Sequence, residues 1–232
     1  RTGGSSVTMG IEPEEGAVML DGSEMNEIIE LNEVDMQVTA RCGTPLQHLE
    51  NYLNKMGYTT GHSPQSLPLA QMGGLVATRS IGQFSTLYGG IEDLLVGLEA
   101  VLPNGEIVRI KNVPRRSVGP DLRALFLGSE GTLGFITEVT VKIFKYLPEE
   151  RWMCAYQIDD MQTGLEAIRE VMTEGYRPAV VRLHDPIEVE LLFNAVTEPG
   201  KALMLFLAED PKSITDATDA AIDEIVKKHG AQ

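Results

Sequence analysis

The sequence has few cysteines, few aromatic side chains and no long apolar run. Cys42 and Cys154 are its only cysteines, and neither has a neighbouring histidine or cysteine at the spacing of a metal site. A bound metal and a disulfide framework are therefore not expected, and we predict that both thiols are reduced and interior. No apolar stretch is long enough to span a bilayer, and residues 1–6 lack the charged-then-apolar order of a signal peptide. The sequence therefore predicts a soluble, cytoplasmic protein without a membrane span.

Basic side chains are also scarce. Lys and Arg total 19 against 34 Asp and Glu, which gives a net charge of −15. This charge repels polyanions, so nucleic acid is not an expected partner. A phosphate group would have to be bound locally, by backbone N–H groups in Gly-rich turns or at helix N-termini. Hydrophobic residues make up 43% of the chain, enough to form the core of one large domain or of two.

Neither a Rossmann fingerprint nor a Walker loop is present, which leaves nicotinamide binding and nucleoside-triphosphate hydrolysis without their motifs. Three other Gly-rich segments occur, at residues 1–7, 64–82 and 128–136. Each one alone is typical of turns, because glycine readily adopts positive φ. Their combination is informative, because several such segments can surround one ligand.

The pattern between these segments predicts a mixture of strands and helices. Short β-type runs at 17–21 and 26–31 precede a strand at 36–42. Thr44 as N-cap and Pro45 at the first helical position then predict a helix that Gly57 ends. Further predicted elements are a short helix over 73–79, a hairpin of 93–102 and 106–110 around Asn104-Gly105, a short helix over 121–127 and a strand over 135–144.

Beyond Pro148 strand and helix patterns alternate. Strands are predicted at 152–158, 179–183 and 202–208, and helices at 161–174, 186–194 and 214–228. This alternation predicts a second α/β unit with helices packed on a sheet. We place the domain boundary near Leu147, which gives domains 1–147 and 148–232.

The Gly-rich segments lie in longer stretches that are shared with a known family: RTGGSSVTMG, TTGHSPQSLPLAQMGGLVATRSIG, LYGGIEDLLVGLEAVLPNGEIVR and PRRSVGPDLRALFLGSEGTLGFITEVTVKI. In order and content they resemble the PCMH-type FAD-binding domain of the vanillyl-alcohol oxidase superfamily. Thr78-Arg79-Ser80 and Gly119-Pro120-Asp121 resemble its alkyldihydroxyacetonephosphate synthase-like branch more than its D-lactate and glycolate dehydrogenases.

The resemblance implies an α+β fold. Its first part is a PCMH-type FAD-binding domain without its N-terminal portion, and its second part is the start of an α/β cap (substrate) domain. The implied cofactor is FAD. The catalytic tyrosine and histidines of the family lie in sequence beyond Gln232, so no catalytic residue can be assigned.

In such proteins the first Gly-rich loop surrounds the pyrophosphate, and the other two continue the cofactor site. Ser5 stands where covalently flavinylated relatives carry histidine, so the resemblance implies dissociable FAD. The implied cofactor-binding residues are Thr2, Gly3, Gly4, Ser5, Ser6, Val7, Pro64, Ser66, Gln71, Met72, Gly73, Gly74, Thr78, Arg79, Ser80, Gly82, Glu130, Gly131, Thr132, Leu133, Gly134 and Ile136.

Four polar residues have two readings each. Arg79 either approaches the pyrophosphate or a substrate anion, or forms an ion pair with a nearby acid. For Glu130 and His62 we favour structural hydrogen bonds over acid–base catalysis, because no partner is recognisable beside His62. Arg182 resembles an arginine of the synthase-like cap domain that would bind an anionic substrate group, and its alternative is pairing with Asp185 or Glu188.

The leading functional prediction is an FAD-dependent oxidoreductase that oxidises a small hydroxylated substrate such as a 2-hydroxy acid. The enzymatic alternative is alkyl-for-acyl exchange on a glycerone phosphate, as in the synthase-like branch. A non-catalytic flavin-binding fragment is the third reading. The expected partner is a small-molecule substrate, and a homodimer is left open.

Overall fold

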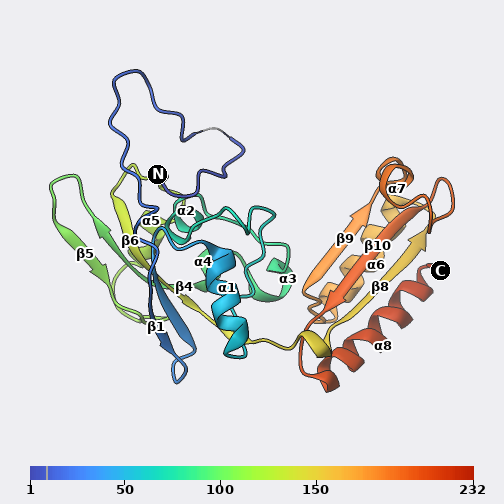
Figure 1. Ribbon diagram of the computed structural model, residues 1–232. Helices are drawn as coiled ribbons and strands as arrows, with labels where there is room; N and C mark the ends of the chain where they lie inside the picture. The colour runs from blue at the N-terminus through green and yellow to red at the C-terminus, as the bar shows by residue number, and fades with distance from the viewer. Residues whose placement is uncertain (9) are drawn as a thin grey trace. The chain divides into compact units, whose positions relative to one another are not determined.

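The computed structural model describes residues 1–8 and 10–232 and divides them into two compact units. The first unit contains residues 1–83 and 88–146, and the second contains 84–87 and 147–232 (Figure 1). Each has its own buried hydrophobic core. In the described residues, no helix combines the length and apolar character needed to cross a membrane.

A five-stranded antiparallel sheet forms the centre of the first unit, with strand order β1-β2-β6-β4-β5. The strands are β1 (Ile28–Asn32), β2 (Gln37–Arg41), β4 (Leu95–Val101), β5 (Ile107–Ile110) and β6 (Phe135–Lys142). The predicted hairpin is confirmed: β4 pairs with β5, and Gly105 in the turn between them has a φ of 86°. In β2 the side chains alternate: Val38 and Ala40 lie in the core, while Thr39 and Arg41 lie on the other face and contact polar side chains of β6.

Short helices accompany this sheet. They are α1 (Leu46–Lys55), α2 (Met72–Ala77), α4 (Ile91–Leu94) and α5 (Arg123–Phe126), and β3 (Tyr58–Thr59) pairs with β7 (Phe144–Lys145). One more short helix, α3 (Ser85–Tyr88), lies mostly in the segment that belongs to the second unit. The core contains Leu46, Leu49 and Leu53, which recur on one face of α1, and also Met72, Leu75 and Val76 of α2. Packing on the sheet thus fixes the position of α2.

Three predictions about elements were wrong. Residues 17–21 form no strand, and all five of them are exposed. Thr44 is not the N-cap of α1, because its buried hydroxyl donates to Glu27 O at 3.2 Å and Pro45 takes the cap position. Asp93 belongs to α4 instead of the following strand, and its carboxylate accepts a hydrogen bond from Gly90 N.

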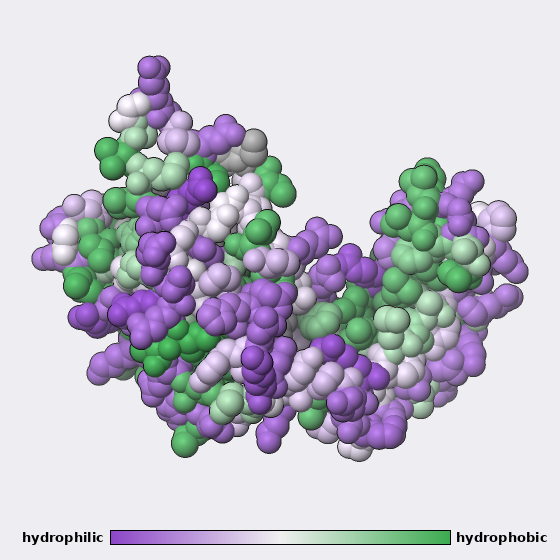
Figure 2. All heavy atoms as spheres, viewed as in Figure 1, coloured by the Kyte–Doolittle hydropathy of each residue, from purple (hydrophilic) through white to green (hydrophobic). Residues whose placement is uncertain are grey.

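The second unit is a three-stranded antiparallel sheet with its two longest helices on one face. After the 3₁₀ turn Pro148–Glu150 come β8 (Trp152–Ile158), α6 (Met161–Thr173), β9 (Val180–His184), α7 (Pro186–Leu192), β10 (Ala202–Ala208) and α8 (Lys212–Lys228). The strand order is β8-β10-β9. Helices α6 and α8 pack together on the sheet, while exposed apolar side chains gather at α7 (Figure 2).

Candidate functional site

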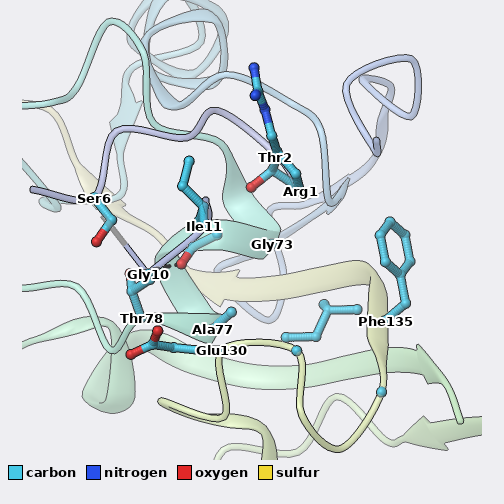
Figure 3. A pocket seen from close by; sticks show the side chains of 14 residues that line it. Arg1, Thr2, Ser6, Gly10, Ile11, Gly73, Ala77, Thr78, Glu130 and Phe135 are labelled. Atoms are coloured by element: carbon cyan, nitrogen blue, oxygen red, sulfur yellow. Dashed lines mark hydrogen bonds between the residues drawn. The ribbon is translucent and has the colours of Figure 1, made fainter. Parts of the chain in front are cut away.

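A cavity of about 130 Å³ lies in the first unit where the first and third Gly-rich segments meet α2. Figure 3 shows Ser6, Gly10 and Ile11 on the N-terminal loop, close to Ala77, Thr78 and Glu130. The lining residues are Arg1, Thr2, Ser6, Gly10, Ile11, Gly73, Gly74, Ala77, Thr78, Glu130, Gly131, Gly134, Phe135 and Ile136. All three Gly-rich segments therefore contribute to one cavity.

Glycine is required at α2 because the first loop and the sheet approach its backbone closely. A Cβ atom at Gly74 would lie 2.5 Å from Thr2 Oγ1, and one at Gly73 would lie 2.6 Å from Cys42 Cβ. On the first loop, a Cβ atom at Gly3 would lie 2.1 Å from Leu69 O. Such distances exclude a side chain unless a neighbour moves. These glycines thus bring three chain segments together.

The N-terminus of α2 is not free to bind an anion. Met72 N donates to Thr44 O at 3.1 Å, and Gly73 N donates to Cys42 O at 2.8 Å. Instead, the side and the C-terminal end of the helix line the cavity, through Gly74, Ala77 and Thr78.

The C-terminal end of α2 has the two hydrogen bonds of a Schellman motif. Ser80 N donates to Leu75 O at 2.9 Å, and Arg79 N donates to Val76 O at 3.2 Å. The left-handed position of this motif is usually glycine, but here it is Arg79, with a φ of 51°. The Arg79 side chain is exposed and has no ion pair within the described part of the chain. The alternative reading of Arg79 as an ion-paired residue thus has no partner in the structure.

The third Gly-rich segment is held against the same helix end. Glu130 N donates to Ala77 O at 2.9 Å, and Gly128 N donates to Val76 O at 3.1 Å. Glu130 and Gly131 both adopt left-handed backbone conformations, with φ of 49° and 83°. A Cβ atom at Gly131 would meet no protein atom within 4 Å, so this backbone faces open space. Positive φ in a residue other than glycine costs about 1–2 kcal/mol, and such residues cluster at functional sites.

Many of the cofactor residues implied by sequence lie at this cavity, and others do not. Those that line it are Thr2, Ser6, Gly73, Gly74, Thr78, Glu130, Gly131, Gly134 and Ile136. Those that do not are Gly3, Gly4, Ser5, Val7, Pro64, Ser66, Gln71, Met72, Arg79, Ser80, Gly82, Thr132 and Leu133. Among these, the Met72 side chain lies in the hydrophobic core and Val7 is 93% exposed.

Sequence reasoning missed five lining residues: Arg1, Gly10, Ile11, Ala77 and Phe135. Ala77 and Phe135 lie within or next to motifs that were recognised, so their contribution follows from the path of the backbone. Gly10 is the last residue of the first family stretch and Ile11 follows it, and neither was assigned to the cofactor. Only folding of the N-terminal loop over α2 brings them to the cavity.

His62 lies away from the cavity lining, in a buried polar network. Its Nε2 is 3.1 Å from Ser80 Oγ, while Nδ1 is buried and has no hydrogen-bond partner among the described residues. Burial lowers the pKa of the imidazole to about 4. His62 N donates to Thr60 Oγ1, and Thr60 N donates to the Glu50 carboxylate at 2.8 Å. These contacts agree with the structural reading of His62.

The composition around the cavity suits an anionic dinucleotide. Residues 51–91, which include the second Gly-rich segment and α2, contain no Asp or Glu in a chain that has 34 of them. Buried polar atoms without a partner in the described residues, Gln71 Oε1 and Ser129 Oγ, stand next to two of the Gly-rich segments. Glu130 is the one carboxylate among the lining residues, so a pyrophosphate fits best at the Thr2 and Ser6 side.

The cavity is small for a whole cofactor. Pockets that enclose a complete small molecule usually measure about 300–1,000 Å³, against about 130 Å³ here. The described residues therefore fit FAD as a cradle for part of the molecule. Thr2, Ser6 and the backbone at Gly74 and Gly131 are the groups that would hold it.

Arg182 lies in the second unit, on the sheet face opposite α6 and α8. Its strand neighbours Val181 and Leu183 pack in the core under α6 and α8, so strand alternation directs Arg182 to the other face. Its cross-strand partner there is Leu205. Neither predicted ion pair forms: the Asp185 side chain caps α7, and Arg182 is exposed without an ion pair in the described structure.

A family model and several known proteins are similar in sequence to this chain. Residues 1–111 match the family model described as FAD binding domain. The chain is 56% identical over 230 residues to the uncharacterized FAD-linked oxidoreductase YgcU of Escherichia coli O157:H7, covering 99% of this chain and 47% of that protein. It is 40% identical over 169 residues to D-lactate dehydrogenase [cytochrome] 1 of Saccharomyces cerevisiae, covering 72% of this chain and 28% of that protein.

A solved structure of alkyldihydroxyacetonephosphate synthase superimposes on the whole chain with a TM-score of 0.88 and 27% identity, covering 48% of the synthase. The predicted α+β fold class is confirmed by this likeness. The chain spans 47% of the length of YgcU and 48% of the synthase structure, which is about half of each relative.

Proposed function

Since this chain carries an FAD-binding domain of the PCMH type, as its motifs predicted, we propose that it forms the flavin-holding part of an FAD-dependent oxidoreductase. The observation that carries the proposal is the meeting of all three Gly-rich segments at one cavity next to an acid-free stretch. Relatives named FAD-linked oxidoreductase and D-lactate dehydrogenase support it. The proposed substrate is a small hydroxylated compound such as a 2-hydroxy acid.

In this proposal, FAD supplies the redox chemistry by accepting a hydride, and the protein binds and orients. The hydroxyls of Thr2 and Ser6 donate hydrogen bonds to phosphate oxygens. Gly74 and Gly131 let the backbone approach the cofactor without a side chain between them. Arg79 follows the lining residue Thr78 in sequence, and its exposed guanidinium, without an ion pair in the described residues, is available to a phosphate group.

We propose that the FAD is held without a covalent bond, because Ser5 offers no imidazole for attachment. The test is to purify the full-length protein, denature it with acid and measure flavin in the supernatant. We expect a yellow protein that releases intact FAD. Flavin that stays with the precipitate would contradict non-covalent binding, and a colourless protein that takes up no FAD would contradict the proposed function itself.

Arg182 is the proposed anchor for the anionic group of the substrate. An exposed guanidinium without an acidic partner in the described residues, with Leu205 as its cross-strand neighbour, is suited to pair with a carboxylate or phosphate. Anaerobic mixing of the full-length protein with D-lactate or glycolate should bleach the oxidised flavin. Arg182→Ala should weaken that substrate by at least tenfold, or about 1.4 kcal/mol. Arg177→Ala, a nearby exposed arginine without an ion pair, is the control and should change nothing.

Alkyl-for-acyl exchange on a glycerone phosphate is the second candidate, favoured by the likeness to the synthase structure over the whole chain. A panel of hydroxy acids, polyols and acyl-glycerone phosphate separates the candidates. A spectral change with acyl-glycerone phosphate alone would replace the oxidoreductase proposal. A protein that binds FAD but responds to no compound would instead support a non-catalytic flavin-binding role.

A cytoplasmic location also belongs to this proposal, and cell fractionation tests it.

A further inference from the structure

One short segment of this acidic chain has the opposite charge. Residues 109–118, called the basic segment below, begin at the end of β5 and continue into the connection that leads to α5 (Figure 1). They include Arg109, Lys111, Arg115 and Arg116. No Asp or Glu occurs between Glu106 and Asp121. Four of the 19 basic residues of the chain thus lie within eight positions.

Most of these charges are not neutralised by the protein. Arg109 Nε is 2.6 Å from Glu99 Oε2, but Lys111 and Arg115 have no ion pair in the described part of the chain. Arg116 donates a hydrogen bond to the Lys111 carbonyl, which closes the loop. It forms no ion pair in the described residues, although its charge is one of the causes that lower the pKa of Asp121, after the hydrogen bonds from Arg123. Every side chain from Lys111 to Pro120 is exposed.

The segment is held at the edge of the sheet by an arginine outside it. Arg123 Nη1 donates to Leu95 O at 2.8 Å and to Val96 O at 3.1 Å, and its Nη2 donates to Pro114 O at 3.2 Å. Asp121 pairs with the same guanidinium at 2.6 Å. The loop is therefore tied to β4 at Pro114, and the cations on either side of this point are presented to solvent.

Apolar side chains alternate with the cations. Val113 is 41% exposed and Val118 is 77% exposed. Cations that attract lipid phosphates, combined with apolar side chains that enter the headgroup boundary, are the pattern of a peripheral membrane contact. The segment lacks aromatic side chains on which nucleic-acid bases could stack.

We propose that the basic segment is a docking surface for an anionic phospholipid bilayer. The remaining acidic surface does not cancel this attraction, because charges in physiological salt are screened beyond about 8 Å. The same acidic surface repels the bilayer wherever it approaches closely. Docking is therefore restricted to the face that carries the segment.

The test is sedimentation of the full-length protein with vesicles of phosphatidylglycerol and phosphatidylcholine, compared with vesicles of phosphatidylcholine alone. We expect binding only to the anionic vesicles, and its loss at high salt. Lys111→Gln/Arg115→Gln should weaken binding about 30-fold, the effect of removing two surface cations. Arg169→Gln/Arg177→Gln, which removes the same charge from exposed arginines of the second unit, should leave binding unchanged.

A second variant tests the apolar part. Val118→Ser keeps every charge and should weaken vesicle binding severalfold, and unchanged thermal unfolding shows that each variant is folded. Equal binding of the Lys111→Gln/Arg115→Gln variant and its control would overturn the proposal. Absence of binding to anionic vesicles would also overturn the proposal. This includes the outcome in which the segment binds an acidic protein but no vesicle.

Discussion

At the scale of single residues, the glycines at the cavity serve two different purposes. Gly73 and Gly74 leave room for neighbouring protein segments, whereas Gly131 has no protein atom near its missing side chain and is needed for its positive φ. Substitutions at the two kinds of position should therefore have different consequences. Both can be measured as flavin affinity and as free energy of unfolding.

Gly131→Val should reduce FAD binding by at least tenfold. A β-branched residue is strongly disfavoured at a φ of 83°, so the loop next to the cavity must change conformation. Gly105→Val is a matched control, because Gly105 has a φ of 86° and an equally open environment in the β4–β5 turn. Both variants should lose about 1–2 kcal/mol of unfolding free energy. The FAD affinities of the two variants, measured by titration, should differ. Equal affinities would place the Gly131 loop away from the cofactor.

Gly74→Ala should weaken FAD binding through Thr2. The new Cβ atom would lie 2.5 Å from Thr2 Oγ1, and rotation of the Thr2 side chain would relieve the contact but displace its hydroxyl. Thr2→Ala should weaken binding to a similar degree. In the Thr2→Ala background, Gly74→Ala should have little further effect, because the two changes remove one interaction. Additive losses in FAD titrations would show that Gly74 acts by another route.

His62 should make the first unit sensitive to mild acid. Its folded pKa of about 4 lies below the ordinary value of 6.5, so the unfolded chain binds the proton first as the pH falls. The stability is complete above pH 6.5 and is lost progressively down to pH 4, by roughly 3 kcal/mol. His62→Gln should remove this dependence in urea unfolding at a series of pH values, and His48→Gln, at an exposed histidine, should retain it.

At the scale of elements, α2 connects the core to the cavity, and its C-terminal end is unusual. Arg79→Gly should raise the free energy of unfolding by about 1 kcal/mol, because glycine is favoured at the left-handed position of the Schellman motif. The same variant should bind FAD more weakly, since it lacks the guanidinium. Arg79→Ala keeps the strained backbone and should show only the loss of affinity. A gain in stability without any loss of affinity would make Arg79 irrelevant to the cofactor.

Elements with a strong local signal could be predicted from sequence. The leucine spacing of α1 and the Asn104-Gly105 turn carry their own structural information, and both are confirmed. Residues 17–21 have the composition of a strand but lack a neighbouring strand to pair with, which local sequence cannot reveal. Thr44 is a good N-cap by type, but its hydroxyl is used by Glu27, a contact fixed by tertiary structure.

The candidate site shows the same limit. Its motifs predicted FAD, but not which backbone groups remain free to contact it. Carbonyls of Thr44 and Cys42 occupy the first N–H groups of α2, and this depends on how β2 packs beside the helix. Gly10 and Ile11 reach the cavity only through the path of a loop.

At the scale of the whole molecule, the second unit includes four residues, Phe84–Leu87, from a distant part of the sequence. Within that unit the Arg151 guanidinium lies 5.7 Å from the centre of the Phe84 ring and also pairs with the buried Glu209. The hydrophobic periodicity of the sequence could not assign Phe84–Leu87 to the second unit, because the assignment depends on contacts between residues more than sixty positions apart.

Phe84→Ala should therefore loosen the second unit and spare the first. We expect faster hydrogen exchange in β8 and β10, and unchanged exchange in β4 and β6. Phe84→Leu should have a smaller effect, since it keeps apolar contact and loses only the ring beneath Arg151. Equal exchange throughout the Phe84→Ala protein would show that this segment contributes nothing to the unit.

The second unit is formed by two separate stretches of the chain, and this has a consequence during synthesis on the ribosome. Phe84–Leu87 leave the ribosome about 60 residues before the rest of their unit begins at Leu147. At roughly 5–20 residues per second, the delay is about 3–12 s. The β4–β5 hairpin, in contrast, can form as soon as its own residues emerge. For those seconds Phe84 is an aromatic side chain on a nascent chain whose partner Arg151 has not yet been made. Such transiently exposed apolar surface is prone to aggregation until the rest of the unit has been synthesised.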